Sequence, residues 1–135
     1  MAVTRERVDG KRRLLVTRTV EAPIDTLWDI LTDTERWPEW GPSVRGVEST
    51  DRYVQTGTTG RVETPLGISL PFEITHCEPY RWTWTVARIP ATGHRIDTLD
   101  DGKCRVVFEL SPLAVGYAPV CERALRRIEA LATRS

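Results

Sequence analysis

The chain has 135 residues, 40% of them hydrophobic and 28% charged, which is typical of one globular domain around a single core. Its formal net charge of +0 gives no support to general binding of nucleic acid or anionic membranes, and no apolar run is long enough to span a bilayer. The cysteines Cys77, Cys104 and Cys121 are odd in number and lack metal-ligand spacing. We therefore expect no disulfide framework, no metal site and a reducing, cytoplasmic location.

The N-terminal stretch is polar and ends in the turn signal Asp9-Gly10, so we expect residues 1–10 to fray or to start an edge strand. Residues 11–20, rich in Leu, Val and Thr, form the first predicted strand. Helical spacing then predicts a helix with Pro23 at its first position, where a missing N–H costs nothing. The apolar face of this helix comprises Ile24, Leu27, Trp28 and Leu31.

A second, very short helix is predicted directly after the first. Asp33 has the kind of side chain that accepts hydrogen bonds from the free N–H groups of a helix N-terminus. Pro38 disfavours the helical conformation at Trp37, so we expect the helix to end there and an aromatic turn to follow through Pro42. Two short helices with an apolar face need a concave surface to cover.

Short strands separated by turn signals follow the helices. The six predicted strands are residues 43–49, 61–64, 68–77, 80–88, 93–99 and 104–110. Pro71 inside one of them argues for an edge position or a bulge. Residues 90–93 and Asp100-Asp101-Gly102 are predicted turns. Sequential strands joined by short turns make an antiparallel sheet.

The helical pattern returns near Tyr117, after a predicted linker at residues 111–116. An apolar stripe that includes Cys121 and Ala124 lies opposite a charged face that includes Glu122, over about four turns. The predicted class is therefore α+β: a curved antiparallel sheet of seven strands whose twist curls it around the C-terminal helix.

The helical segment carries a resemblance to a known superfamily. Val20-x-Ala22-Pro23, then Leu27-Trp28-x-Ile30-Leu31-x-Asp33, then Arg36-Trp37-x-x-Trp40-x-Pro42 is similar to the opening of the START-like, or SRPBCC, helix-grip superfamily. The closest branch is that of polyketide cyclases/dehydrases and lipid transport, which Gly93-His94-Arg95 before Asp100-Asp101-Gly102 also resembles. The resemblance implies one helix-grip domain over residues 1–135, with an apolar cavity between sheet and helix. It also implies binding of sterols, lipids, quinones or polyketides, or cyclisation and dehydration.

An aromatic site between the sheet and the last helix is predicted. Trp82 and Trp84 share a strand face, and they either line a cavity or fill the core. Small side chains on the last helix leave volume, which favours a pocket. The predicted ligand-binding residues are Trp40, Phe72, Trp82, Trp84, Ile96, Phe108, Tyr117, Cys121 and Ala124.

His94 is the candidate catalytic residue, because it alternates onto the inner face and histidine exchanges protons near neutral pH. A hydrogen-bonded or rim histidine without chemistry is the simpler alternative. Glu73 and Arg61 alternate outward, but a bulge at Pro71 would turn Glu73 inward, so their direction stays open. His76, at a strand end, is predicted to be exposed.

Three functions remain open from the sequence. The first is binding of a small hydrophobic molecule of the lipid, quinone or aromatic polyketide class, by a monomer or homodimer without a cofactor. The second is a polyketide cyclase or dehydratase that uses His94 as acid and base. The third is a ligand-free interaction protein, such as a co-chaperone. Binding ranks first, because many members of the resembled superfamily only bind and one fold hosts many functions.

Overall fold

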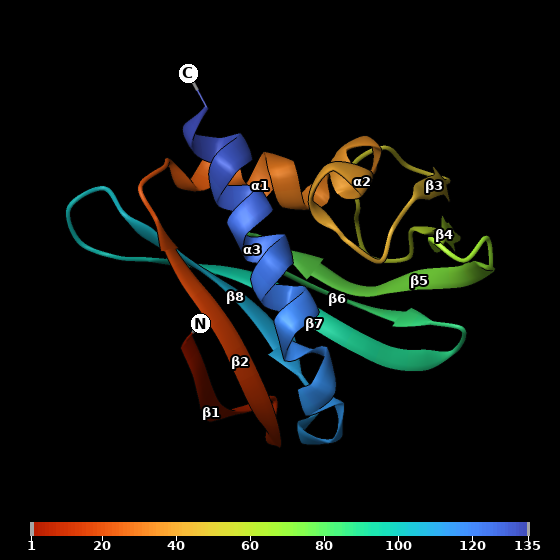
Figure 1. Cartoon of the computed structure of the whole chain (residues 1–135), viewed down its shortest axis with the longest axis horizontal. Helices are drawn as coiled ribbons and strands as arrows, with labels where there is room; N and C mark the ends of the chain where they lie inside the picture. Colours follow the sequence, from red (N-terminus) through yellow and green to blue (C-terminus); the bar gives the residue numbers. More distant parts are fainter. Residues whose placement is uncertain (1, 135) are drawn as a thin grey trace.

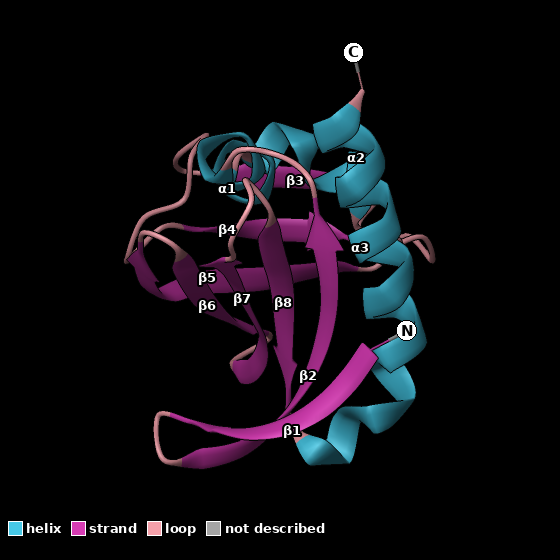
Figure 2. Ribbon diagram, turned by 90° about the vertical axis from the view of Figure 1, so that its left-hand side faces the viewer, coloured by secondary structure: helices cyan, strands magenta, loops and turns pink. Residues whose placement is uncertain are grey.

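A curved antiparallel sheet with a long helix across its concave side forms the protein in a computed structural model, which describes residues 2–134 (Figures 1 and 2). The strand order is β1-β2-β8-β7-β6-β5-β4-β3. The elements are β1 Ala2–Val8, β2 Lys11–Val20, α1 Ile24–Thr32, the 3₁₀ turn η1 Thr34–Arg36, α2 Trp37–Trp40, β3 Gly46–Ser49, β4 Thr59–Glu63, β5 Ser69–Glu78, β6 Arg81–Val86, β7 Ile89–Thr98, β8 Cys104–Leu110, the 3₁₀ helix η2 Pro112–Tyr117 and α3 Ala118–Thr133. The termini of the predicted domain, residues 1 and 135, lie outside the described residues.

The sheet has eight strands instead of the seven predicted. The additional strand is β1, which pairs with β2 through a turn at Asp9 and Gly10, where φ is +52° and +77°. Most side chains of β1 stay in solvent, so the strand has no buried face and no apolar alternation to reveal it. Of the two expectations for this stretch, the edge strand is therefore the one found.

The helical segment agrees with the prediction except at Trp37 and at Pro23, which is the N-cap residue just before α1 and not its first helical residue. Asp33 caps the 3₁₀ turn, since its carboxylate accepts a hydrogen bond from Glu35 N at 3.0 Å. The segment does not end at Trp37, which takes helical angles (φ −54°, ψ −41°) and begins α2. Its buried indole donates to Leu31 O at 3.0 Å and stacks on Trp82 at 5.3 Å between ring centroids. Pro38 disfavours helical angles at Trp37, but the buried contacts of the Trp37 side chain stabilise them more strongly.

Two turn and edge predictions in the central strands are wrong. Pro71 lies inside β5, which has β4 on one side and β6 on the other, and the register shift comes later, between Ile74 and His76. Residues 90–93 belong to β7, because the turn lies earlier, at Ala87 and Arg88, both with positive φ. A two-residue turn of this kind matches the twist of the flanking strands.

The C-terminal helix begins at Ala118, and the predicted linker before it is the 3₁₀ helix η2, capped by the Ser111 hydroxyl. Glu122, predicted on the solvent face of α3, is buried instead. Arg18 reaches up from the concave face of β2 and binds Glu122 at 3.1 Å and Glu129 at 2.8 Å. A cluster of three charged side chains between sheet and helix therefore replaces part of the expected apolar contact.

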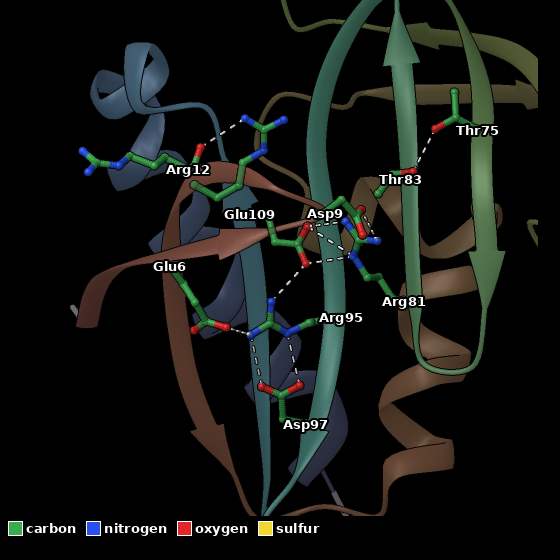
Figure 3. Close-up of polar contacts among 10 residues, drawn as sticks. Glu6, Asp9, Arg12, Thr75, Arg81, Thr83, Arg95, Asp97 and Glu109 are labelled. Atoms are coloured by element: carbon green, nitrogen blue, oxygen red, sulfur yellow. Dashed lines mark hydrogen bonds and ion pairs between the residues drawn. The ribbon is translucent and has the colours of Figure 1, made fainter.

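The opposite face of the sheet also holds a buried carboxylate, Glu109 (Figure 3). Arg81 of β6 and Arg95 of β7 contact it at 2.8 and 3.1 Å. The N-terminal hairpin reaches the same arginines, since Asp9 contacts Arg81 at 3.0 Å and Glu6 contacts Arg95 at 3.8 Å. These ion pairs join the hairpin to the central strands. Among residues 2–134, no helix combines the length and the apolar character needed to cross a membrane.

Candidate ligand-binding site

An apolar chamber of about 40 Å³ lies between the concave face of the sheet and α3. Its walls come from α2 and the segment after it, from β6, β7 and β8, and from η2 and α3, and seven of the fifteen lining residues are Trp, Tyr, Phe or His. The lining includes Trp37, Trp40, Trp82, Trp84, Thr92, His94, Phe108, Cys121 and Ala124. A chamber of this size has room for a few water molecules at most.

A second chamber of about 320 Å³ adjoins the first and opens at the surface. Both are lined by Ser43, Val44, Trp84, Thr92 and Tyr117, so the smaller chamber is the inner end of one cavity. The Ser43 and Tyr117 hydroxyls hydrogen-bond at 2.7 Å and tie the segment after α2 to the end of η2. The outer chamber reaches the lower end of the volumes that small-molecule sites occupy.

A chain of hydrogen bonds leads from the shared wall to His94. Trp84 Nε1 donates to Thr92 Oγ1 at 3.3 Å, and Thr92 Oγ1 lies 2.9 Å from His94 Nε2. The tautomer of His94 decides whether Thr92 Oγ1 donates to His94 Nε2 or accepts from it, because a hydroxyl can accept two hydrogen bonds. Neither His94 Nδ1 nor Trp82 Nε1 has a hydrogen-bond partner within residues 2–134, and both atoms are buried. Trp82, which lines the inner chamber, therefore carries a buried N–H donor without an acceptor.

The predicted catalytic residue, His94, lies inside the protein with 2% of its surface exposed. Its ring stacks on Trp82 at 3.9 Å between centroids and meets Phe108 edge-on at 4.9 Å. Burial lowers the pKa of His94 to about 3, against a smaller opposing effect of the Trp82 backbone. At neutral pH the imidazole is therefore uncharged and is a poor proton donor.

The cavity walls carry no formal charge: neither chamber is lined by Asp, Glu, Lys or Arg within the described part of the chain. Glu73 and Arg61, whose direction the sequence left open, are both exposed and line neither chamber. Arg61 instead binds the Ser69 hydroxyl at 2.9 Å. Burial also raises the pKa of the Cys121 thiol to about 12, so this cysteine does not present a nucleophilic thiolate.

Most of the predicted site residues are gathered in one place. Those that line the inner chamber are Trp40, Trp82, Trp84, Phe108, Tyr117, Cys121 and Ala124, together with His94. Phe72 and Ile96 are buried in the core and line neither chamber, with Phe72 packed on Trp37 and Trp84. His76 is exposed, as predicted. Whether any of these side chains contacts a ligand stays a prediction.

Sequence analysis missed Trp37, Ser43 and Thr92 as lining residues. Thr92 was hidden because residues 90–93 look like a turn, although its two-residue spacing from His94 is the signal that could have placed it. Trp37 was recognised in the helical segment but not assigned to the site. Ser43 lies in an irregular connection, where no periodicity indicates which side chains point inward.

A curved sheet that holds a C-terminal helix around an apolar cavity defines the helix-grip class of fold. The sequence profile of the family described as polyketide cyclase / dehydrase and lipid transport matches residues 11–133, and the chain belongs to this family. The matched range begins at β2 and leaves β1 outside it. No functionally curated protein matches the sequence.

Solved structures from several bacteria share the fold. The protein MLL2253 from Mesorhizobium loti superposes with a TM-score of 0.74 at 18% identity, over 92% of this chain and 98% of that one. XoxI from Bacillus cereus has a TM-score of 0.71 at 8% identity, covering 90% and 96%. Ms6760 from Mycobacterium smegmatis has a TM-score of 0.64 at 21% identity, covering 99% of both chains. Identities this low establish similarity of fold alone.

Proposed function

We propose that the protein binds a small, uncharged hydrophobic molecule that carries a hydrogen-bond acceptor, such as a quinone or an aromatic polyketide. The observation that carries this proposal is a partly open cavity with many aromatic side chains, whose walls bear no charge and include Trp82, whose Nε1–H has no hydrogen-bond partner within residues 2–134. Membership of a family described by polyketide chemistry and lipid transport supports the same class of ligand.

The absence of charged walls argues for an uncharged ligand. A carboxylate moved from water into an apolar cavity without a cation or several donors costs several kcal/mol. A ketone or quinone oxygen costs far less to desolvate, and it can accept a hydrogen bond from Trp82 Nε1. The aromatic walls favour flat rings, which stack on indoles.

Catalysis by His94 ranks below binding. A cyclase or dehydratase moves protons at carbons beside a carbonyl, and efficient general catalysis needs a group whose pKa lies near the working pH. Burial holds the pKa of His94 at about 3, far below that range. No Asp, Glu or Lys within residues 2–134 lines the cavity to act as its partner.

Titration with matched neutral and anionic probes tests the proposal. Menadione, a neutral naphthoquinone, and decanol are compared with decanoate by thermal shift and calorimetry. We expect binding of the neutral probes, and binding of decanoate at least tenfold weaker, because each 1.4 kcal/mol of desolvation is worth a factor of ten. No heat and no thermal shift with any probe, or equal binding of decanol and decanoate, contradicts the proposal.

A variant that fills the mouth locates the site. Ala114 lines the outer chamber, and Ala114→Phe should weaken menadione binding by roughly tenfold while leaving the free energy of unfolding nearly unchanged. Ala130→Phe is the matched control, because Ala130 lies on the exposed face of α3. Equal affinities in the two variants would show that menadione binds elsewhere.

A further inference from the structure

Exposed apolar side chains stand around the mouth of the cavity. Leu113 is 97% exposed and Leu66 is 87% exposed. Three more large apolar side chains are exposed: Ile68 between β4 and β5, Ile89 at the start of β7 and Val115 in η2. The chain segments that carry them also line the outer chamber, through Thr64, Pro90 and Ala114 among others. Single exposed apolar residues are ordinary, but several around one cavity mouth indicate an interaction surface.

The N-terminal hairpin beside this mouth concentrates positive charge. Five basic side chains lie on β1 and the start of β2: Arg5, Arg7, Lys11, Arg12 and Arg13. Within residues 2–134 none of the five forms an ion pair. The hairpin's own acids, Glu6 and Asp9, are engaged with Arg95 and Arg81. The hairpin therefore presents uncompensated positive charge, although the whole chain is neutral.

The positive and apolar features meet in one groove. A groove of about 460 Å³ is lined by Pro112 of η2 and by five hairpin residues, of which four are basic and one is acidic: Arg5, Glu6, Arg7, Arg12 and Arg13. Leu113, the most exposed apolar residue of the surface, follows Pro112 directly. Figure 1 shows the hairpin and the segment that leads into α3 together at the lower edge of the molecule.

We propose that the mouth of the cavity docks on an anionic lipid bilayer. The hairpin arginines face lipid phosphates, and the five apolar side chains around the mouth enter the interface between headgroups and acyl chains. Amphipathic surfaces of this composition bind membranes through buried apolar area plus attraction to anionic lipid. Charge complementarity selects an anionic surface, and docking in this orientation opens the outer chamber toward the lipid.

Vesicle co-sedimentation of the full chain tests the proposal without any cavity ligand. We expect binding to vesicles with about one third phosphatidylglycerol, little binding to pure phosphatidylcholine, and weakening by salt. The double variant Arg5→Gln/Arg12→Gln should weaken binding about twenty-five-fold, because each arginine contributes about fivefold. The matched control is Arg123→Gln/Arg127→Gln, which removes the same charge from exposed positions on α3 and should bind as wild type.

The apolar contribution is tested separately with Leu113→Ser, which should lower the affinity for the same vesicles several-fold without unfolding the protein. Three outcomes overturn the proposal. The first is that the protein does not bind anionic vesicles, and the second is that both double arginine variants lose the same vesicle affinity. The third is that inorganic phosphate releases the protein from vesicles more strongly than chloride does at equal ionic strength, which indicates a discrete anion site. Menadione affinity is read on its own, so failure here leaves the proposed ligand binding untouched.

Discussion

At the scale of single residues, His94 shows how packing decides chemistry. The imidazole pairs across strands with Trp82, stacks on its ring and uses Nε2 for the Thr92 hydroxyl. Those contacts replace water, and the loss of water penalises the charged form more than the neutral form. The same residue in solvent would be the acid–base group that its type indicates, whereas here it is a neutral part of an aromatic wall.

The buried imidazole makes stability depend on pH. The pKa of His94 is about 3 in the folded protein and about 6.5 when unfolded, so between these values the unfolded state binds more protons and stability falls as pH falls. Between pH 7 and pH 5 this contribution amounts to about 2 kcal/mol. In urea unfolding, the stability difference between wild type and His94→Gln should shrink by about 2 kcal/mol over that interval.

The exposed His76 provides the comparison for this experiment, and His76→Gln should retain the wild-type pH dependence. If the free energy of unfolding falls equally in the wild type and in His94→Gln between pH 7 and pH 5, His94 is hydrated or charged in the folded state.

At the scale of secondary-structure elements, Gly93 and Glu109 join the central strands. The two residues pair directly between β7 and β8, and a Cβ atom at position 93 would collide with the Glu109 carboxylate. The missing side chain lets Glu109 lie flat on the sheet and reach Arg81 and Arg95. Removing one partner of such a buried charge group leaves the other uncompensated, which is costly.

We expect Gly93→Ala to lower the free energy of unfolding by about 1–3 kcal/mol, because the added methyl displaces the carboxylate from its arginines. Gly46→Ala in β3 is the matched control, since a Cβ atom there meets Glu63 Oε2 at an ordinary 3.6 Å. The control should be neutral or slightly stabilising, because alanine restricts the unfolded chain more than glycine. Equal effects of the two substitutions in urea unfolding would refute the steric argument.

At the scale of the whole molecule, the N-terminal hairpin adds to the family fold. The family match begins at residue 11, so β1 is outside it, yet β1 covers the edge of β2 from Lys11 to Thr17. The hairpin also carries the ion pairs to Arg81 and Arg95 on the convex face (Figure 3). Five basic side chains of the hairpin lie at one end of the molecule, and the net charge of +0 does not reveal this local excess.

Deletion of residues 2–8 should expose the edge of β2. We expect the free energy of unfolding to fall by roughly 1–3 kcal/mol through lost cross-strand contacts. Self-association should appear in light scattering, because an uncovered strand edge pairs with other chains. Glu6→Gln, which removes only the exposed ion pair with Arg95, should change stability by less than about 0.5 kcal/mol. A monomeric deletion variant of wild-type stability would contradict this role of β1.

Local patterns in the sequence were sufficient for most of the fold. The two-residue alternation of β8, the helical spacing of α1 and α3, and the Asp33 cap are set by residues close in the chain. They indicated the sheet, the gripped helix and most of the aromatic site. The strand β1 escaped detection because its side chains remain in solvent, so pairing with β2 alone defines it.

Contacts between residues distant in the chain decided the remainder. Trp37 is helical because its indole donates a hydrogen bond to Leu31 O and stacks on Trp82. Glu122 is buried because Arg18 reaches it from β2, and Glu109 is buried against Arg81 and Arg95. The neutrality of His94 and the walls of the cavity depend on desolvation, which is a property of the assembled core. By itself the sequence determined which elements form and which faces are apolar, since those follow from local periodicity. Only the tertiary structure decided which polar groups lost their water, because that depends on neighbours brought together by folding.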